Sequence, residues 1–206
     1  MRMMRTFIAV NIPVEIKQVL QEEIDRLRAL IRGESVRWVR SEGIHLTLKF
    51  LGEISNSSLG EIHQTLEREV EKHPSCTLRV GGFGCFPNRR RPRVLWIGIT
   101  EDKGTLAQLQ SSINEKLVPL GFGKEGRPFH PHLTLGRVRR NGSMSDLTQL
   151  QDAINEFDVG QIGQFEVREI HLIESILKPT GAEYCTLGEY TLEGKGDRWR
   201  ENQLSA

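Results

Sequence analysis

The sequence predicts an α/β protein of the α+β type, with two lobes related by a pseudo-twofold axis. The four-residue word His-Leu-Thr-Leu occurs twice, at residues 45–48 and 132–135, which indicates an internal duplication. A short apolar segment precedes each copy at a similar distance: Phe7 lies 38 residues before the first copy and Trp96 lies 36 residues before the second. We therefore expect each lobe to hold an antiparallel-rich sheet with helices outside, and a ligand cleft between the lobes.

The first half of the chain is expected to start with a strand and a long helix. Residues 5–11 form a short apolar run with β propensity, which predicts a buried strand. Pro13 begins a helix whose apolar positions follow the helical period as far as Gly33. The elements expected next are an extended piece at 36–40, a strand at 44–51 that stops at Gly52, a helix at 57–72, a strand at 76–80 and a loop rich in glycine, proline and arginine at 81–92.

The second half repeats this order from the apolar segment at 93–100. The elements expected after it are a helix at 102–120, a loop at 121–131, a strand at 132–138, a turn at Asn141 and Gly142, a helix at 146–157 and strands at 165–176 and 184–192. No low-complexity linker separates the halves, so we expect one bilobal domain over residues 1–193, with repeats at about 5–83 and 93–192. Residues 194–206 form a polar C-terminal tail.

Each copy of the repeated word predicts a strand with two different faces. In an extended strand, alternate side chains share a face, so His45 and Thr47 point one way. Leu46, Leu48 and Phe50 are expected on the opposite face, in the core. The second copy divides in the same way, with His132 and Thr134 on the front and Leu133 and Leu135 on the back. Two such fronts that face each other would form one site.

The residue types on these fronts suit an in-line displacement at phosphorus. Histidine titrates near neutral pH, so one imidazole can accept a proton from the attacking group while the other donates one to the leaving oxygen. Thr47 and Thr134 can hold the non-bridging phosphate oxygens, where negative charge develops. A single strand histidine is more often structural, but the repetition favours catalysis. This chemistry needs no metal, and a strained 2',3'-cyclic phosphate is a suitable substrate.

The arginines of the sequence leave two alternatives open. A regular pleat places Arg137 on the leucine side of its strand, so it reaches the phosphate only if the strand ends or bulges at Gly136. Arg89 to Arg91, with Arg139 and Arg140, form clusters that usually belong to solvated loops. A local basic rim that guides RNA is the functional alternative.

Composition limits the classes to which the protein can belong. Its formal net charge of +1 at pH 7 is too small for coating by nucleic acid, so anion binding must be local. No apolar run is long enough to cross a membrane, and no secretory signal is recognised, so we expect a cytoplasmic protein. The three cysteines lack C-x-x-C spacing, which disfavours a zinc site. We expect a monomer, because the net charge is near neutral and the sequence has no long exposed apolar stripe. We expect no metal, because no acidic residue lies close to His130 and His132 in the sequence to complete a ligand set.

The motifs of this chain resemble those of bacterial and archaeal RNA 2',3'-cyclic phosphodiesterases of the 2H phosphoesterase superfamily, also described as 2'-5' RNA ligases. The resemblance rests on the two H-x-T-x words and extends from Phe7 to about Leu187. The flanking residues that match are Trp38, the segments 49–52 (KFLG), 92–96 (PRVLW) and 131–137 (PHLTLGR), and the series Ser175, Leu177, Pro179, Gly181 and Tyr184.

The resemblance implies a bilobal fold with an active-site cleft and metal-independent hydrolysis of RNA 2',3'-cyclic phosphate ends to 2'-phosphomonoesters, without a cofactor. It implies that His45 is the proton donor and His132 the proton acceptor, although the sequence alone leaves these roles interchangeable. The expected substrates are RNA with 2',3'-cyclic phosphate ends or cyclic nucleotides. Two alternatives stay open: ATP-independent 2'-5' RNA ligation or hydrolysis on tRNA fragments, and a non-catalytic protein that binds RNA ends or nucleotides.

Overall fold

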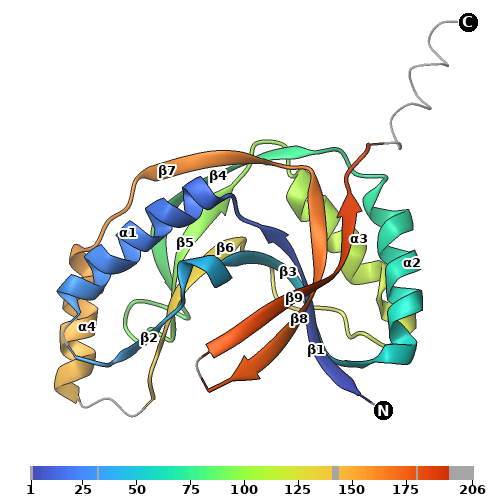
Figure 1. The fold of residues 1–206 in the computed structure, drawn as a ribbon. Helices are drawn as coiled ribbons and strands as arrows, with labels where there is room; N and C mark the ends of the chain where they lie inside the picture. The colour runs from blue at the N-terminus through green and yellow to red at the C-terminus, as the bar shows by residue number, and fades with distance from the viewer. Residues whose placement is uncertain (1, 32, 141–143, 180, 195–206) are drawn as a thin grey trace, which may run out of the picture.

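A computed structural model describes residues 2–31, 33–140, 144–179 and 181–194 (Figure 1). The elements in chain order are β1 (Met3–Asn11), α1 (Val14–Leu30), β2 (Val36–Trp38), η1 (Ser41–Gly43), β3 (His45–Ser55), η2 (Asn56–Ser58), α2 (Leu59–Val70), β4 (Cys76–Phe86), β5 (Val94–Thr100), α3 (Thr105–Lys116), η3 (Val118–Leu120), β6 (His132–Val138), α4 (Met144–Glu156), β7 (Gln161–Val167), β8 (Glu169–Lys178) and β9 (Gly181–Thr191). The turn expected at Asn141 and Gly142, and the tail from residue 195, lie outside the described residues.

The strands form two antiparallel sheets, which confirms the α+β class predicted from the sequence. The four-stranded sheet has the order β3-β1-β8-β9, and the five-stranded sheet has the order β2-β6-β5-β4-β7. Helices α2 and α3 lie beside the four-stranded sheet, while α1 and α4 lie beside the five-stranded sheet (Figure 1). Each histidine strand therefore belongs to a different sheet.

Each sheet combines strands from both halves of the chain. The four-stranded sheet takes β1 and β3 from the first half and β8 and β9 from the second. The five-stranded sheet takes β5, β6 and β7 from the second half and β2 and β4 from the first. The two halves therefore exchange elements, and neither half of the sequence forms a lobe by itself.

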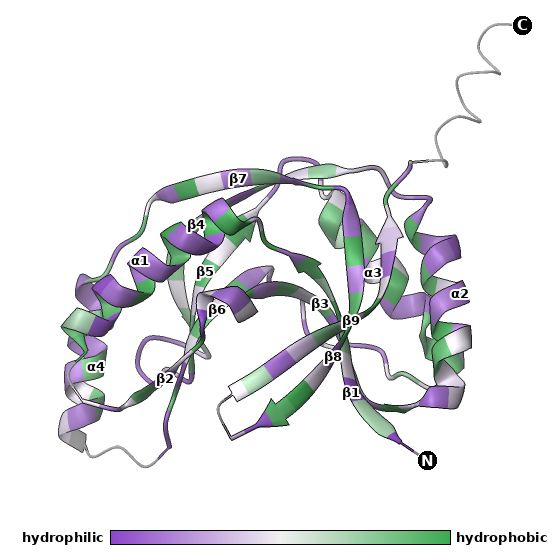
Figure 2. Cartoon of the chain, in the orientation of Figure 1, coloured by the Kyte–Doolittle hydropathy of each residue, from purple (hydrophilic) through white to green (hydrophobic). Residues whose placement is uncertain are grey.

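Most of the apolar positions predicted for the helices are buried, whereas Val14 and Leu30 at the two ends of α1 are 60% and 45% exposed. Ile16, Leu20, Ile24 and Leu27 of α1 are each at most 7% exposed, because they recur at helical spacing on one face. The stripes of α2 and α3 are buried in the same way. In Figure 2, hydrophilic and hydrophobic residues alternate along the ribbons of α1 and α2. Among the described residues, no helix has the length and apolar character needed to span a bilayer.

The prediction of a single strand at residues 165–176 was wrong. The chain forms β7 in the five-stranded sheet, passes through Arg168 and enters the four-stranded sheet as β8. A continuous β-type sequence does not reveal this crossing, because both parts have the same local propensity and differ only in their partners.

Two strands continue through glycine positions where the sequence predicted a strand end (Gly52) or a loop (Gly82). β3 runs past Gly52 and β4 runs past Gly82, and both glycines have a φ of +74°. Each lies beside a shift in the pairing register. Glycine adopts this left-handed conformation without a steric penalty, so the chain absorbs a bulge and the strand resumes.

Candidate active site at the junction of the two sheets

Both histidines of the repeated words are held by the same local contact. His45 is the first residue of β3, and its Nδ1 lies 2.9 Å from the carbonyl oxygen of Gly43. His132 is the first residue of β6, and its Nδ1 lies 2.6 Å from the carbonyl oxygen of His130. A carbonyl oxygen can only accept a hydrogen bond, so Nδ1 carries the proton in each ring. This leaves Nε2 of each ring as the atom that can gain or lose a proton.

A β-bulge in β3 changes the face on which its next residues lie. Ala9 of β1 pairs with Thr47 and Ile8 pairs with Lys49, so Leu48 is the extra residue. Phe50 then pairs with Phe7, on the face that carries His45 and Thr47. The expectation that Phe50 lies in the core was therefore wrong, and its side chain is 60% exposed.

The second histidine strand contains a bulge at the corresponding position. Trp96 of β5 pairs with Thr134 and Leu95 pairs with Gly136, so Leu135 is the extra residue. Arg137 then pairs with Val94, on the face that carries His132 and Thr134. The condition under which Arg137 could face the site, a bulge next to Gly136, is met.

The bulge in β6 is packed tightly against β2. A Cβ atom added to Gly136 would lie 2.7 Å from Cγ1 of Val36 and 3.1 Å from the indole of Trp38. Only glycine therefore fits at this point without displacing β2. The two bulges also make Phe50 and Arg137 equivalent in the repeat: each lies five residues after its histidine, but one is aromatic and the other is cationic.

One guanidinium group acts on both histidines. The pKa of His45 is lowered to about 4, mainly because the ring is buried, and the positive charges of Lys17 and Arg137 lower it further. The pKa of His132 is also lowered, mainly by burial, with contributions from the charges of Arg137 and His130. In each ring the hydrogen bond to the backbone carbonyl opposes these effects. The charge of Arg137 thus acts on both imidazoles, and the strands that carry the two rings, β3 and β6, contact each other.

Aromatic rings account for the burial of the two imidazoles. Phe7 stacks on His45 at a centroid distance of 4.5 Å, and Tyr184 of β9 meets the same ring edge-on at 5.2 Å. Phe86 meets His132 edge-on at 4.9 Å. Phe7 and Trp96 would ordinarily be expected to pack in the core. Phe7 instead packs on the ring of His45, and the ring centroid of Trp96 lies 6.1 Å from that of His132.

Comparison with known proteins identifies the family of this chain. The sequence model described as the 2'-5' RNA ligase superfamily matches residues 16–178, which is more than half of the chain. This chain belongs to the 2'-5' RNA ligase superfamily. The resemblance inferred from the two H-x-T-x words is thereby confirmed.

Curated members of the superfamily cover almost the whole chain. The RNA 2',3'-cyclic phosphodiesterase of Thermotoga maritima is 36% identical over 191 residues, which are 93% of this chain and 97% of that protein. The protein of the same name from Archaeoglobus fulgidus is 36% identical over 184 residues, which are 89% of this chain and 98% of that protein.

Solved structures of similar fold include TT0787 of Thermus thermophilus and E. coli LigT complexed with 3'-AMP. TT0787 has a TM-score of 0.76 and 27% identity, with 93% of this chain and 100% of that chain covered. LigT has a TM-score of 0.72 and 27% identity, with 93% of this chain and 99% of that chain covered.

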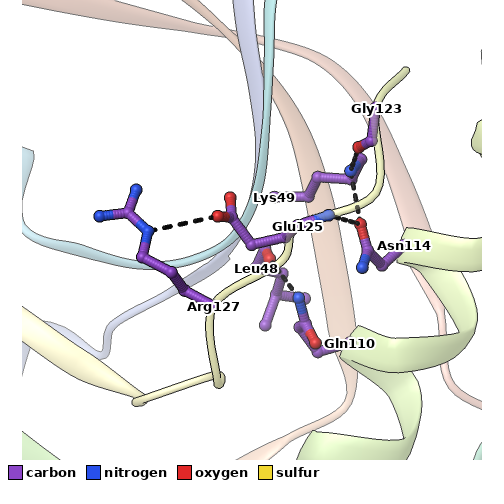
Figure 3. A network of polar contacts seen from close by, with 7 residues as sticks. All are labelled: Leu48, Lys49, Gln110, Asn114, Gly123, Glu125 and Arg127. Carbon is purple, nitrogen blue, oxygen red and sulfur yellow. Dashed lines mark hydrogen bonds and ion pairs between the residues drawn. The ribbon is translucent and has the colours of Figure 1, made fainter. Parts of the chain in front are cut away.

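In this superfamily member, a polar network ties the bulge of β3 to the segment that leads to His132 (Figure 3). Lys49, the residue after the bulge, is 6% exposed and donates hydrogen bonds to Oδ1 of Asn114 (2.6 Å) and to the carbonyl oxygen of Gly123 (2.8 Å). Asn114 Oδ1 also accepts a hydrogen bond from the backbone N–H of Glu125 (3.1 Å). Gln110 donates to the carbonyl oxygen of Leu48 (3.2 Å). Helix α3 thus fixes parts of both histidine segments.

Both threonines of the repeated words lie on the histidine faces. Thr47 pairs with Ala9, and Thr134 pairs with Trp96. Both are half-buried. Within the part of the chain that the structure describes, neither hydroxyl is hydrogen bonded to another protein group, so each can donate to a ligand.

No grouping of metal-ligand residues is present in the described ranges, since no three histidine, cysteine, aspartate or glutamate residues lie close enough to hold a metal ion. His130 lies two residues before His132 in the sequence. Its ring lies near Phe86, with a distance of 6.2 Å between the ring centroids. The polar side chains described at this site carry imidazole, hydroxyl, ammonium and guanidinium groups.

Lys17 is a site residue that the sequence did not reveal. It lies on α1, and its Nζ donates a hydrogen bond to the carbonyl oxygen of Glu42 (2.9 Å), next to the Gly43 carbonyl that holds His45. In the sequence Lys17 is one more polar residue of an amphipathic helix. It comes near His45 because α1 packs against η1.

The Lys17→Met substitution should raise the pKa of His45 and leave that of His132 unchanged. Removing a positive charge stabilises the protonated imidazole, so the ring of His45, which titrates at about 4 in the unmodified protein, should titrate at higher pH. NMR titration of the imidazole resonances measures both values. The matched control is Lys116→Met at the end of α3, which should leave the pKa values of both imidazoles unchanged. Equal shifts of both rings would contradict a local effect of Lys17.

Proposed function

We propose that this chain is a phosphoric diester hydrolase that opens RNA 2',3'-cyclic phosphate ends to 2'-phosphomonoesters. The observation that carries the proposal is the pair of imidazoles, each with Nδ1 fixed on a carbonyl oxygen and both under the influence of Arg137. Such a pair can serve two proton transfers at one phosphorus atom. His45 is the proposed proton donor and His132 the proposed proton acceptor.

The lowered pKa of His132 suits a base. At neutral pH its ring is neutral, so Nε2 can take a proton from the attacking water. The hydrogen bond from Nδ1 to the His130 carbonyl oxygen then stabilises the charged ring that results. The water oxygen forms a bond to phosphorus as its proton moves to His132.

His45 must gain a proton before it can act as a donor. Its pKa of about 4 in the free protein leaves it neutral at pH 7. A bound cyclic phosphate carries one negative charge, which offsets the effect of Lys17 and Arg137 and favours the charged imidazole. Nε2 of His45 can then protonate the ribose 3' oxygen as its bond to phosphorus breaks. The products are a 3'-hydroxyl and a 2'-phosphomonoester.

The remaining residues on this face suit phosphate and base binding. Thr47 and Thr134 can donate hydrogen bonds to the non-bridging oxygens, and Arg137 can bind them in bidentate fashion. Phe50, 60% exposed and next to Phe7 at 6.1 Å, offers a ring on which the terminal base can stack. Neither a metal nor a cofactor enters this scheme.

The relatives support the proposed substrate. The curated proteins from Thermotoga maritima and Archaeoglobus fulgidus are named RNA 2',3'-cyclic phosphodiesterases, and LigT of similar fold was solved with an adenosine monophosphate. The substrates proposed for this chain are accordingly RNA with cyclic ends or cyclic nucleotides. A monomeric state and a cytoplasmic location stay predictions.

Incubation with a nucleoside 2',3'-cyclic phosphate in EDTA tests the proposal. We expect full turnover with the 2'-phosphate as the product, identified by ³¹P NMR. A 3'-phosphate product would reverse the identity of the leaving oxygen and contradict the roles given to the histidines. Loss of turnover in EDTA, restored by a divalent metal, would contradict the metal-free mechanism.

The superfamily description favours RNA ligation as a second candidate activity. The same two proton transfers would join RNA ends if the 5'-hydroxyl of a second RNA replaced water as the nucleophile. Its oxygen would bond to the phosphorus of the cyclic phosphate as its proton moves to His132, and the bond from phosphorus to the 3' oxygen would break as His45 protonates that oxygen, which leaves a 2'-5' phosphodiester and a 3'-hydroxyl. RNA halves ending in a cyclic phosphate and a 5'-hydroxyl test this without ATP. The absence of a joined product would reject ligation and leave hydrolysis. Tight binding of the cyclic end with no turnover would instead support a non-catalytic RNA-end binder.

A further inference from the structure

Four arginines line a cavity at the end of β5 and β6. The cavity has a volume of about 370 Å³, and its charged lining includes Arg91, Arg93, Arg139 and Arg140. We refer to it as the arginine pocket. The whole chain has a net charge of only +1, so this is a marked local concentration of positive charge.

The arginine pocket begins where the proposed phosphate site ends. Arg137 pairs with Val94, and the next residues along each strand, Val138 and Arg93, line the pocket. The backbone N–H of Val138 donates to the carbonyl oxygen of Arg93 at 3.0 Å. Because a strand rises about 3.3 Å per residue, the pocket starts within a few ångströms of the backbone of Arg137.

The loop that carries Arg91 is held in place by hydrogen bonds. Oδ1 of Asn88 accepts the backbone N–H groups of Arg90 and Arg91, both at 3.1 Å. The carbonyl oxygen of Arg90 accepts a hydrogen bond from Gln151 of α4 (2.6 Å). Arg89 donates to the carbonyl oxygen of Ile154 (2.7 Å), so it fastens the loop to α4 and does not belong to the pocket lining. The position of Arg91 is thus fixed before any ligand binds.

Protein carboxylates balance this charge only in part. Arg139 lies 3.8 Å from Glu34, whose side chain is 90% exposed, so this ion pair is weak. Asp146 of α4 also lines the pocket. Among the ion pairs of the described residues, none involves the guanidinium groups of Arg91, Arg93 or Arg140. The pocket therefore retains a net positive charge that suits an anion.

We propose that the arginine pocket binds a backbone phosphodiester of RNA on the 5' side of the cyclic end. The inference rests on the proposed function. Val138 lies six residues along β6 from His132, about 20 Å at about 3.3 Å per residue, so an RNA whose terminal phosphate lies between the two histidines would reach the pocket with a phosphate a few nucleotides upstream of the cyclic end. A charged groove that follows the sugar-phosphate backbone is a common way to bind single strands without reading the bases. The enzyme should therefore prefer oligonucleotides to cyclic mononucleotides.

A double substitution, Arg93→Gln with Arg140→Gln, tests the pocket. For an oligoribonucleotide with a cyclic end, we expect kcat/KM to fall about tenfold, mainly through KM, because the variant lacks two charged donors to phosphate. The slope of log(kcat/KM) against log[salt] should decrease by about 0.7 for each phosphate that is no longer neutralised. Turnover of a cyclic mononucleotide, which has no second phosphate, should stay within twofold. The matched control is Arg68→Gln on the exposed side of α2, which should leave kcat/KM unchanged for both substrates.

A substrate change tests the same inference with the unmodified protein. Replacing the phosphodiesters upstream of the cyclic end, one at a time, by a neutral methylphosphonate should at one position raise KM to the level of the double variant, and the double variant should show little further loss with that oligonucleotide. An equal KM for all of these oligonucleotides, or an equal loss with the mononucleotide, would overturn the inference. Failure of the proposed function gives a different result, because the cyclic mononucleotide would then not be hydrolysed by any form of the protein.

Discussion

Replacement of His45 or His132 by glutamine is expected to lower kcat for a 2',3'-cyclic nucleotide by about 10²–10⁴-fold, the usual effect of a positioned acid or base. Glutamine keeps a polar group of similar size but cannot exchange a proton at Nε2. Both rings are fixed through Nδ1, so the substitutions remove the proton transfer and leave the rest of the face in place. Steady-state kinetics with a cyclic mononucleotide measures the loss. His73→Gln, at the end of α2, is the matched control and should keep full activity.

The identity of the leaving group distinguishes the two histidines. A phosphodiester that releases a nitrophenolate needs no proton donor, because this anion is stable in water. With such a substrate, the loss caused by His45→Gln should shrink to about tenfold or less, while that caused by His132→Gln should persist. The opposite pattern would exchange the two roles. Near-normal turnover in either variant would remove that residue from the mechanism.

Much of the fold follows from local patterns in the sequence. The apolar stripe of α1 has the period of a helix, and its central side chains are buried, although Val14 and Leu30 at its two ends are exposed. Leu46 and Leu133 lie on the core face opposite their histidines, as strict alternation predicts, and are at most 1% exposed. The repeated word also predicted that two equivalent strands would contribute to one site. These inferences need only the periods of helix and strand.

Phe50 shows where such reasoning fails. Alternation counts residues along one strand, but the bulge at Leu48 appears only when β3 is paired with β1. Lys49 and Phe50, which lie between this bulge and the next register shift at Leu51, are therefore on the faces opposite to those that alternation predicts. The same reversal explains why Arg137 stayed ambiguous in the sequence. The residue pattern of one strand does not reveal its pairing register with the neighbouring strand, so a bulge cannot be predicted from that pattern alone.

Long-range packing decided the features that the sequence did not reveal. The exchange of strands between halves depends on which sheet accepts β7 and β8, and their local propensities are alike. Lys17 reaches the site from α1, 28 residues before His45, with no spacing that relates the two. Figure 3 shows a third case, since the contact between Lys49 and Asn114 joins residues 65 positions apart. Such contacts follow from the assembled fold.

Arg137→Gln is expected to lower kcat by about 10²–10³-fold, the usual cost of removing one donor that stabilises charge in a transition state. Arg137→Lys should recover only part of this activity, because an ammonium group cannot bind two phosphate oxygens in the bidentate geometry of a guanidinium. Kinetics with a cyclic mononucleotide measures both variants. Arg68→Gln on α2 is the control for loss of a surface arginine. Full activity in Arg137→Lys would reduce its role to that of a simple positive charge.

Arg137→Gln has a second measurable effect, on the pKa values of the two histidines, which loss of a purely structural arginine would not have. Because the charge of Arg137 lowers the pKa of both His45 and His132, its removal should raise both values, whereas Lys17→Met raises only the first. NMR titration of Arg137→Gln in the absence of substrate separates this effect from any loss of phosphate binding. A shift confined to one ring would mean that the two imidazoles do not share this cation. The proposed site, in which both rings serve a single phosphorus atom, would then be wrong.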